Sequence, residues 1–108
     1  MGLDISAVDP KTQEERAEAR LGDVGFINDL RSLLAEYPDQ FSMILQRVIF
    51  SAAHCGDEIS DPNIMRAIVE ECLRLEDQFA SNAKAMRFAA SLKLVAETAI
   101  DENLILVF

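Results

Sequence analysis

One stretch, residues 39–56, constrains the fold more than any other part of the sequence. It reads DQFSMILQRVIFSAAHCG, and Pro38 and Gly56 stand at its two ends, where such residues typically open and close a helix. At about 100° per residue, its large apolar side chains share one broad face, so that face must be buried. These side chains are Phe41, Ile44, Leu45, Val48, Ile49, Ala52 and Cys55. We therefore predict a central helix over residues 39–55.

Three other segments show the same helical spacing of apolar residues. Each follows a residue that suits a helix N-cap: Asp23, Asp61, and either Ser81 or Asn82. The predicted helices cover residues 24–37, 62–79 and 82–102.

A weaker helix is predicted over residues 10–21. Asp9-Pro10 resembles a helix start, and KTQEERAEARL is rich in strong helix formers, although Leu21 is its only sizeable apolar side chain. Residues 1–8, which precede it, are expected to form a loose arm.

The residues from Leu104 to Phe108 form an apolar tail, LILVF. Five consecutive apolar residues are not expected to stay in water. The tail therefore either packs into a groove of its own chain or docks on another chain, as a strand or as a helical extension.

Together these segments predict an all-α protein, a compact bundle of four main helices with a weak N-terminal helix. The 108 residues match the usual size of one domain, so residues 1–108 are predicted to form a single helical domain. Half of the residues are hydrophobic, which argues against disorder. No apolar run approaches 18 residues, so we expect no membrane span.

The cysteines and the N-terminal residues indicate the cellular compartment. Cys55 and Cys72 fall on predicted apolar faces and are interpreted as small core residues in a reducing compartment, with a disulfide between them as the alternative. MGLDISAVDPK lacks the basic and apolar blocks of a secretion signal. The expected location is the cytoplasm.

The charge of the chain indicates the kind of partner. Nineteen acidic residues against 10 basic ones give a formal net charge of -9. This charge disfavours direct binding to nucleic acid or to anionic lipid, and it favours a basic protein partner.

A strip on the predicted central helix is the candidate contact surface. Met43 and Phe50 project about 180° from its core face, where a surface helix would carry charge. The strip therefore either packs against a second face of the same domain or binds a partner. The candidate partner-binding residues are Met43, Gln46, Arg47, Phe50 and His54.

The sequence shows no motif that carries chemistry: no P-loop, no GxGxxG, no GxSxG, no HExxH and no zinc-spaced cysteine pair. His54 and Cys55 would point in different directions on one helix, so we predict neither a metal site nor a cofactor. Neighbouring acids such as Glu70 and Glu71 also diverge on a helix, which indicates solvated side chains rather than an acid–base pair. The sequence therefore does not predict an enzyme.

These observations favour a small acidic, non-catalytic protein-binding module. By analogy of size and charge, it could be an inhibitor, immunity or antitoxin-type protein that neutralises a more basic partner. The alternatives are a homo-oligomeric structural protein such as a homodimer, an inhibitor that mimics nucleic acid, and a metal or small-ligand binder near His54.

Overall fold

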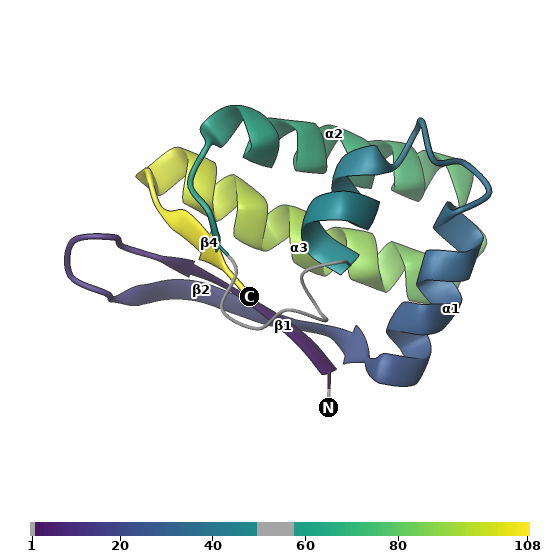
Figure 1. The fold of residues 1–108 in the computed structure, drawn as a ribbon, viewed down its shortest axis with the longest axis horizontal. Helices are drawn as coiled ribbons and strands as arrows, with labels where there is room; N and C mark the ends of the chain where they lie inside the picture. The colour runs from purple at the N-terminus through teal and green to yellow at the C-terminus, as the bar shows by residue number, and fades with distance from the viewer. Residues whose placement is uncertain (1, 50–57) are drawn as a thin grey trace.

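The chain folds into an antiparallel sheet with helices packed on one face (Figure 1). The computed structural model describes residues 2–49 and 58–108. Within these residues the sheet has four strands in the order β2-β1-β4-β3. The prediction of an all-α helical bundle is therefore wrong. The strands are β1 (Gly2–Val8), β2 (Glu15–Asp23), β3 (Glu58–Ile59) and β4 (Ile105–Val107).

A hairpin of β1 and β2 replaces the loose arm predicted over residues 1–8 and the weak helix predicted over residues 10–21. In both strands, apolar residues alternate with polar ones, which is the period of a strand buried on one face. Burial of the apolar residues outweighs the helix propensity of the Ala, Glu and Arg residues in β2. The inward-facing residues are Leu3, Ile5, Ala7, Ala17, Ala19 and Leu21.

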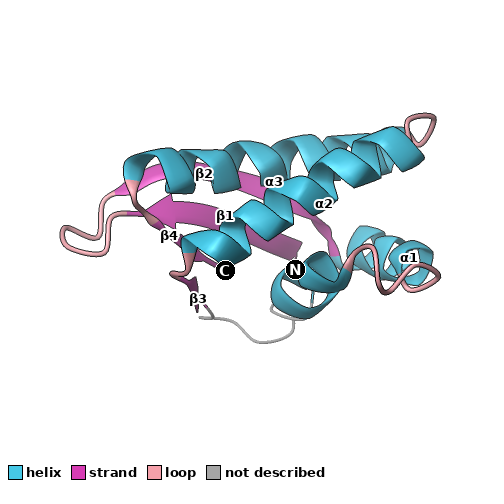
Figure 2. Cartoon of the chain, turned by 90° about the horizontal axis from the view of Figure 1, so that it is seen from above, coloured by secondary structure: helices cyan, strands magenta, loops and turns pink. Residues whose placement is uncertain are grey.

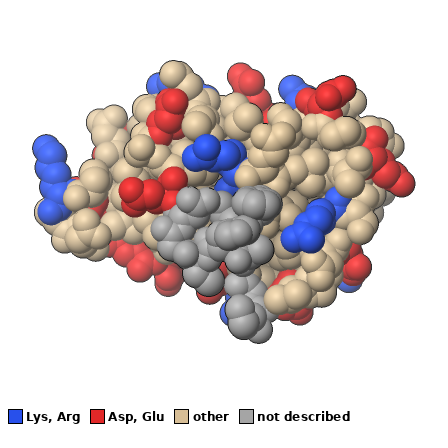
Figure 3. Space-filling model, in the orientation of Figure 1, with Lys and Arg blue, Asp and Glu red and all other residues tan. Residues whose placement is uncertain are grey.

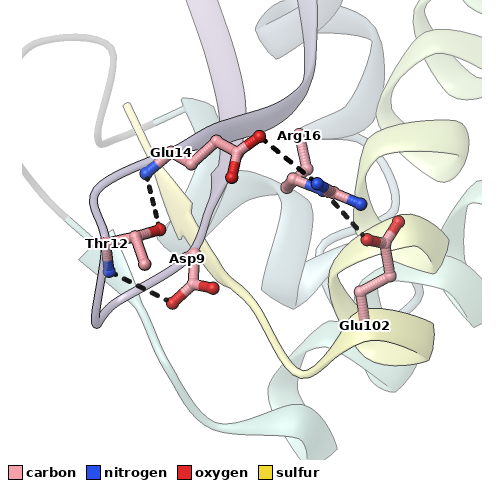
Figure 4. Close-up of polar contacts among 5 residues, drawn as sticks. All are labelled: Asp9, Thr12, Glu14, Arg16 and Glu102. Atoms are coloured by element: carbon pink, nitrogen blue, oxygen red, sulfur yellow. Dashed lines mark hydrogen bonds and ion pairs between the residues drawn. The ribbon is translucent and has the colours of Figure 1, made fainter.

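The hairpin turn is built from the residues that resemble a helix start. Asp9 Oδ1 accepts hydrogen bonds from the backbone N–H groups of Lys11, at 2.8 Å, and Thr12, at 3.4 Å. The backbone N–H of Glu14 donates to Thr12 Oγ1 at 3.2 Å (Figure 4). An Asp side chain serves a turn as well as a helix N-cap, because both structures need an acceptor for N–H groups two or three residues further on.

The apolar tail forms β4 and pairs within its own chain. In β4, Val107 lies opposite Ser6 and Ile105 lies opposite Val8 of β1. On the other side, β4 pairs with β3, and Leu106 between the two partners is fully buried. Of the two interpretations of the tail, the structure shows packing on its own chain, as a strand.

Three helices lie where the sequence predicts them. Their N-caps are Asp23, Asp61 and Asn82, and each side chain accepts a backbone hydrogen bond from the first turn of its helix. The observed ranges are close to the predicted 24–37, 62–79 and 82–102. They are α1 (Val24–Leu34), α2 (Pro62–Gln78) and α3 (Ala83–Glu102).

The predicted central helix over 39–55 is only partly present. Residues up to Phe41 form turns, the helix begins at Ser42, and it continues as a short π-helix, η1 (Ile44–Ile49). The predicted core residues Phe41, Ile44, Val48 and Ile49 are buried. Ala52 and Cys55 lie outside the described residues.

The element at the centre of the fold is α3. It packs against β1, β2, β4 and α2, and it lies beside α2 above the sheet (Figure 2). Its small residues allow this close approach on several sides. The residues that α3 buries are Ala85, Phe88, Ala89, Leu92, Val95, Ala96 and Ala99. In the described part of the chain, no helix combines the length and the apolar character that crossing a membrane requires.

Candidate functional site

The sheet has one face that α2 and α3 cover and one face that no described helix covers (Figure 1). We call the second the outer sheet face. Side chains on a strand alternate between faces, so the neighbours of each buried residue belong to it. Its residues are Asp4, Ser6, Val8, Glu15, Glu18, Arg20, Glu58, Ile105 and Val107.

The apolar part of the outer sheet face lies where β1 meets β4. Val8 lies opposite Ile105, and Val107 lies between Ser6 and Glu58 of the two neighbouring strands. Val8, Ile105 and Val107 are only half-buried. These neighbouring β-branched side chains, which keep part of their surface in water, form a small apolar patch.

The acidic part lies on β2 and the adjoining edge of β1. Ser6 Oγ donates a hydrogen bond to Glu15 Oε1 at 2.8 Å, and this bond together with one shared with Glu18 lowers the pKa of Glu15. The same hydrogen bond with Glu15 and the negative charge of Glu15 raise the pKa of Glu18, and Asp4 adds to this effect. These carboxyl groups repel one another, so a cation that binds among them would be favoured.

Acidic side chains also gather along the lower left margin of the face drawn in Figure 3, where Figure 1 places the hairpin. At the tip of the hairpin, Arg16 binds Glu14 at 3.3 Å and Glu102 of α3 at 3.1 Å (Figure 4). Both ion pairs are exposed, so they fix the position of the turn more than they stabilise the fold.

A second group of polar contacts lies between α2 and the segment before η1, and it includes the buried carboxylate of Glu71. The carboxylate of Glu71 accepts hydrogen bonds from the backbone N–H groups of Met43, at 3.0 Å, and Ile44, at 2.9 Å. Burial raises the pKa of Glu71, while these two bonds and the charge of Arg74 oppose the rise. Arg74 Nη1 also donates to the Gln40 carbonyl at 2.6 Å. Glu71 is only 6% exposed and both of its carboxylate oxygens accept backbone hydrogen bonds, so we assign this cluster the structural role of tying α2 to η1.

The candidate strip from the sequence is only partly visible. Met43 is half-buried and packs against the core, Gln46 is exposed, and Arg47 is half-buried with a partner inside the protein. Phe50 and His54 lie outside the described residues. The strip therefore stays a prediction, although the packing of Met43 supports an internal role for part of it.

The described residues contain no group of three or more His, Cys, Asp or Glu side chains that could hold a metal ion. Cys72 is a free thiol, fully buried, and burial raises its pKa well above the ordinary value, so it is not a ready nucleophile. The prediction that Cys72 is a core residue agrees with its burial, whereas Cys55 and the alternative of a Cys55–Cys72 disulfide involve a residue outside the described ranges.

Three cavities in the described part of the protein are small and open. Phe26 lines two of them, with volumes of about 200 and 280 Å³, and the second is lined also by Arg20 and Arg87. A third, of about 310 Å³, lies near Pro10 and Asn103. Ligand sites are usually at least this large and more enclosed, so these cavities do not support a small-molecule function.

Sequence reasoning missed the outer sheet face because it missed the strands. The signal was present: Leu3, Ile5 and Ala7 alternate with polar residues, and Ala17, Ala19 and Leu21 repeat that pattern. Reading Ala as an apolar residue at period two would have predicted the hairpin and therefore the side on which Glu15 and Glu18 lie.

Comparison with known proteins gives no match to a family model, to a curated protein or to a solved structure.

Proposed function

We propose that the protein is a non-catalytic protein-binding module that holds a basic partner on the outer sheet face. The observation that carries this proposal is the half-exposed patch of Val8, Ile105 and Val107 beside the carboxylates of β2. An apolar centre with charged surroundings is the usual composition of a protein contact surface. The acidic surroundings favour Lys and Arg on the partner and speed up the encounter.

The net charge of the whole chain also supports a basic partner. The formal net charge of -9 attracts a basic protein over a distance of about 10 Å at 0.1 M salt. An inhibitor that neutralises a basic partner is therefore the specific form that we propose. The free thiol of Cys72 suits a reducing compartment, and we propose the cytoplasm as the place of action.

The test compares one variant of the patch with a matched variant elsewhere. Val107→Lys introduces a positive charge on the outer sheet face, whereas Leu73→Lys does so on α2, where Leu73 is 52% exposed. The wild-type protein captures its partner from a native lysate, and the purified partner is then titrated by calorimetry with wild type and both variants. Circular dichroism checks that each variant is folded, and Val107→Thr replaces Val107→Lys if the latter is not.

We expect a captured protein with a basic isoelectric point, a Kd raised about 10-fold or more by Val107→Lys, and a Kd within about twofold of wild type for Leu73→Lys. Binding should also weaken as salt rises. The proposal fails if Val107→Lys binds as wild type does. It also fails if Gln46→Lys alone weakens binding, because the predicted strip on η1 would then be the contact surface.

A further inference from the structure

The strand β2 lies at the margin of the sheet, with β1 on one side and no described element on the other (Figure 2). At nine residues, Glu15–Asp23 is the longest strand described. Register shifts in its pairing with β1 leave Arg16 and Leu21 as extra residues, so the regular part of the strand is Ala17 to Arg20. An unpaired strand edge of this kind is a template for another strand.

From this edge we propose that two copies of the chain pair antiparallel through β2, around a twofold axis at Ala19, and so form one continuous sheet. In that register, Glu18 of each copy lies opposite Arg20 of the other, and Ala17 lies opposite Leu21. Opposite charges in directly paired positions stabilise an antiparallel pair. The same surface meets itself, as a closed twofold dimer requires.

The neighbouring registers are less favourable. Moving the twofold axis from Ala19 to Glu18 puts Glu18 opposite Glu18. Moving it to Arg20 puts Arg20 opposite Arg20. A slip of one residue puts Glu18 opposite Ala19 and turns the helix layers to opposite sides. Both charged residues are available: in the part of the chain that the structure describes, neither Glu18 nor Arg20 forms an ion pair.

Helix α3 supplies a second, independent match. Arg87, Ser91, Leu94, Thr98 and Glu102 are spaced by three or four residues and so lie on one side of α3. This side follows the β2 edge, because Glu102 binds Arg16 and because Arg87 lines a cavity with Arg20 and Leu21. Lys93, which binds Glu76 of α2 at 2.5 Å, marks the opposite side of the helix.

The side chain in the middle of this row is Leu94, which is 67% exposed. A strand rises about 3.3 Å per residue and a helix about 1.5 Å per residue. Counted along β2 and α3 from the Arg16–Glu102 ion pair at one end, and from the cavity that Arg20 shares with Arg87 at the other, Leu94 lies at the level of Ala19. The proposed axis therefore places Leu94 against its own copy, with Ser91 and Thr98 leaving room on either side. It also brings Arg87 of one copy toward Glu102 of the other.

The spacing of the layers fits this contact. Helix α3 packs on both β1 and β2, so it lies between them, and strands are about 4.8 Å apart. Two copies joined at β2 then have their α3 axes about 10 Å apart, which is the packing distance of two helices. The β2–β2 strand pair and the α3–α3 helix pair can therefore form in the same dimer.

Sedimentation velocity of the full chain in about 0.15 M salt, over a wide range of concentration, tests the dimer. We expect a concentration-dependent dimer for the wild type. A monomer at all concentrations up to about 0.5 mM would overturn the proposal.

Charge exchange tests the register. Glu18→Arg and Arg20→Glu each put like charges opposite one another, so each is expected to raise the dimer Kd about 10-fold or more. The double exchange, Glu18→Arg with Arg20→Glu, restores opposite charges and should return the Kd to within a few-fold of wild type. If the single variants dimerise normally, or if the double variant stays as weak as the single ones, β2 is not the contact.

Leu94 provides the second readout. Leu94→Asp should weaken the dimer by a similar factor, whereas the matched exposed leucine on α2, changed by Leu73→Asp, should leave it unchanged. Circular dichroism melting of every variant separates loss of pairing from loss of folding. Because Val107 is far from the axis, Val107→Lys should still dimerise, so a failure of this proposal and a failure of the proposed function give different results.

Discussion

The same strands form both faces of the sheet, but the side chains on the two faces differ in their burial. On the covered face, Ile5 is fully buried, and among the described residues no buried side-chain nitrogen or oxygen lacks a hydrogen-bond partner. On the outer sheet face, Val8 keeps part of its surface in water, and the exposed Glu15 and Glu18 interact with each other, with Ser6 and with Asp4. We therefore expect the covered face to determine stability and the outer sheet face to tolerate substitution better.

The largest difference between the faces should come from truncating one apolar residue on each side of β1. Ile5→Ala leaves a cavity in the core, so we expect it to lower the free energy of unfolding by about 2–5 kcal/mol. Val8→Ala removes a half-exposed side chain and should cost less than about 1 kcal/mol. Urea denaturation measures both, and similar losses for the two variants would show that the outer sheet face is also part of the core.

The next effect concerns the buried carboxylate. Glu71→Ala leaves the N–H groups of Met43 and Ile44 without an acceptor, so it should cost about 1–3 kcal/mol. Glu70→Ala, on the exposed side of α2, is the matched control and should change stability by less than about 0.5 kcal/mol. Equal effects would mean that the Glu71 contacts do not stabilise the protein.

The titration of Glu71 gives a smaller effect with a definite sign. Burial raises the pKa of Glu71, so the folded state holds its proton more firmly than the unfolded state. Its contribution to stability is therefore full below the unfolded pKa of about 4.5 and is lost as the pH rises through the folded pKa. Urea denaturation of wild type and Glu71→Gln should show a difference in unfolding free energy that falls as the pH rises above the unfolded pKa. A difference that grows over this range would contradict the prediction.

The smallest effect should come from the outer sheet face. Glu18→Gln removes the repulsion with Glu15 and Asp4 but touches nothing in the core, so its melting temperature should stay within about 3 °C of wild type. Thermal melting followed by circular dichroism checks this. A fall of 10 °C or more would place Glu18 among the residues that hold the fold together.

The helices were predictable because their signals are local. Asp23, Asp61 and Asn82 cap the three helices of the described fold as their positions in the sequence indicate, and apolar residues repeat every three or four positions behind them. The exposure of Leu94 also follows from that spacing, because it falls outside the buried arc of α3.

The sheet was not predictable by the same reasoning, because its strands are completed by residues far away in the chain. The pairing of β1 with β4 joins residues far apart in the chain and leaves no signal within a short window, whereas the hairpin leaves only the weak alternation of Ala17, Ala19 and Leu21. The helix-forming residues in β2 favoured the prediction of a helix over residues 10–21. Asp9 favoured it too, because an Asp side chain accepts the same hydrogen bonds in a turn as at a helix N-cap. The candidate surface depends on those strands, so it could not be recognised before them.

The pairing of β1 with β4 has a consequence for synthesis on the ribosome. β1 emerges from the ribosome well before β4, and until β4 is made the side of β1 that pairs with it remains unpaired. A nascent chain in this state exposes a β edge to its neighbours, which is a known hazard of slow, long-range folding. Protection of that edge until translation reaches β4 would fall either to a chaperone or to the pace of elongation.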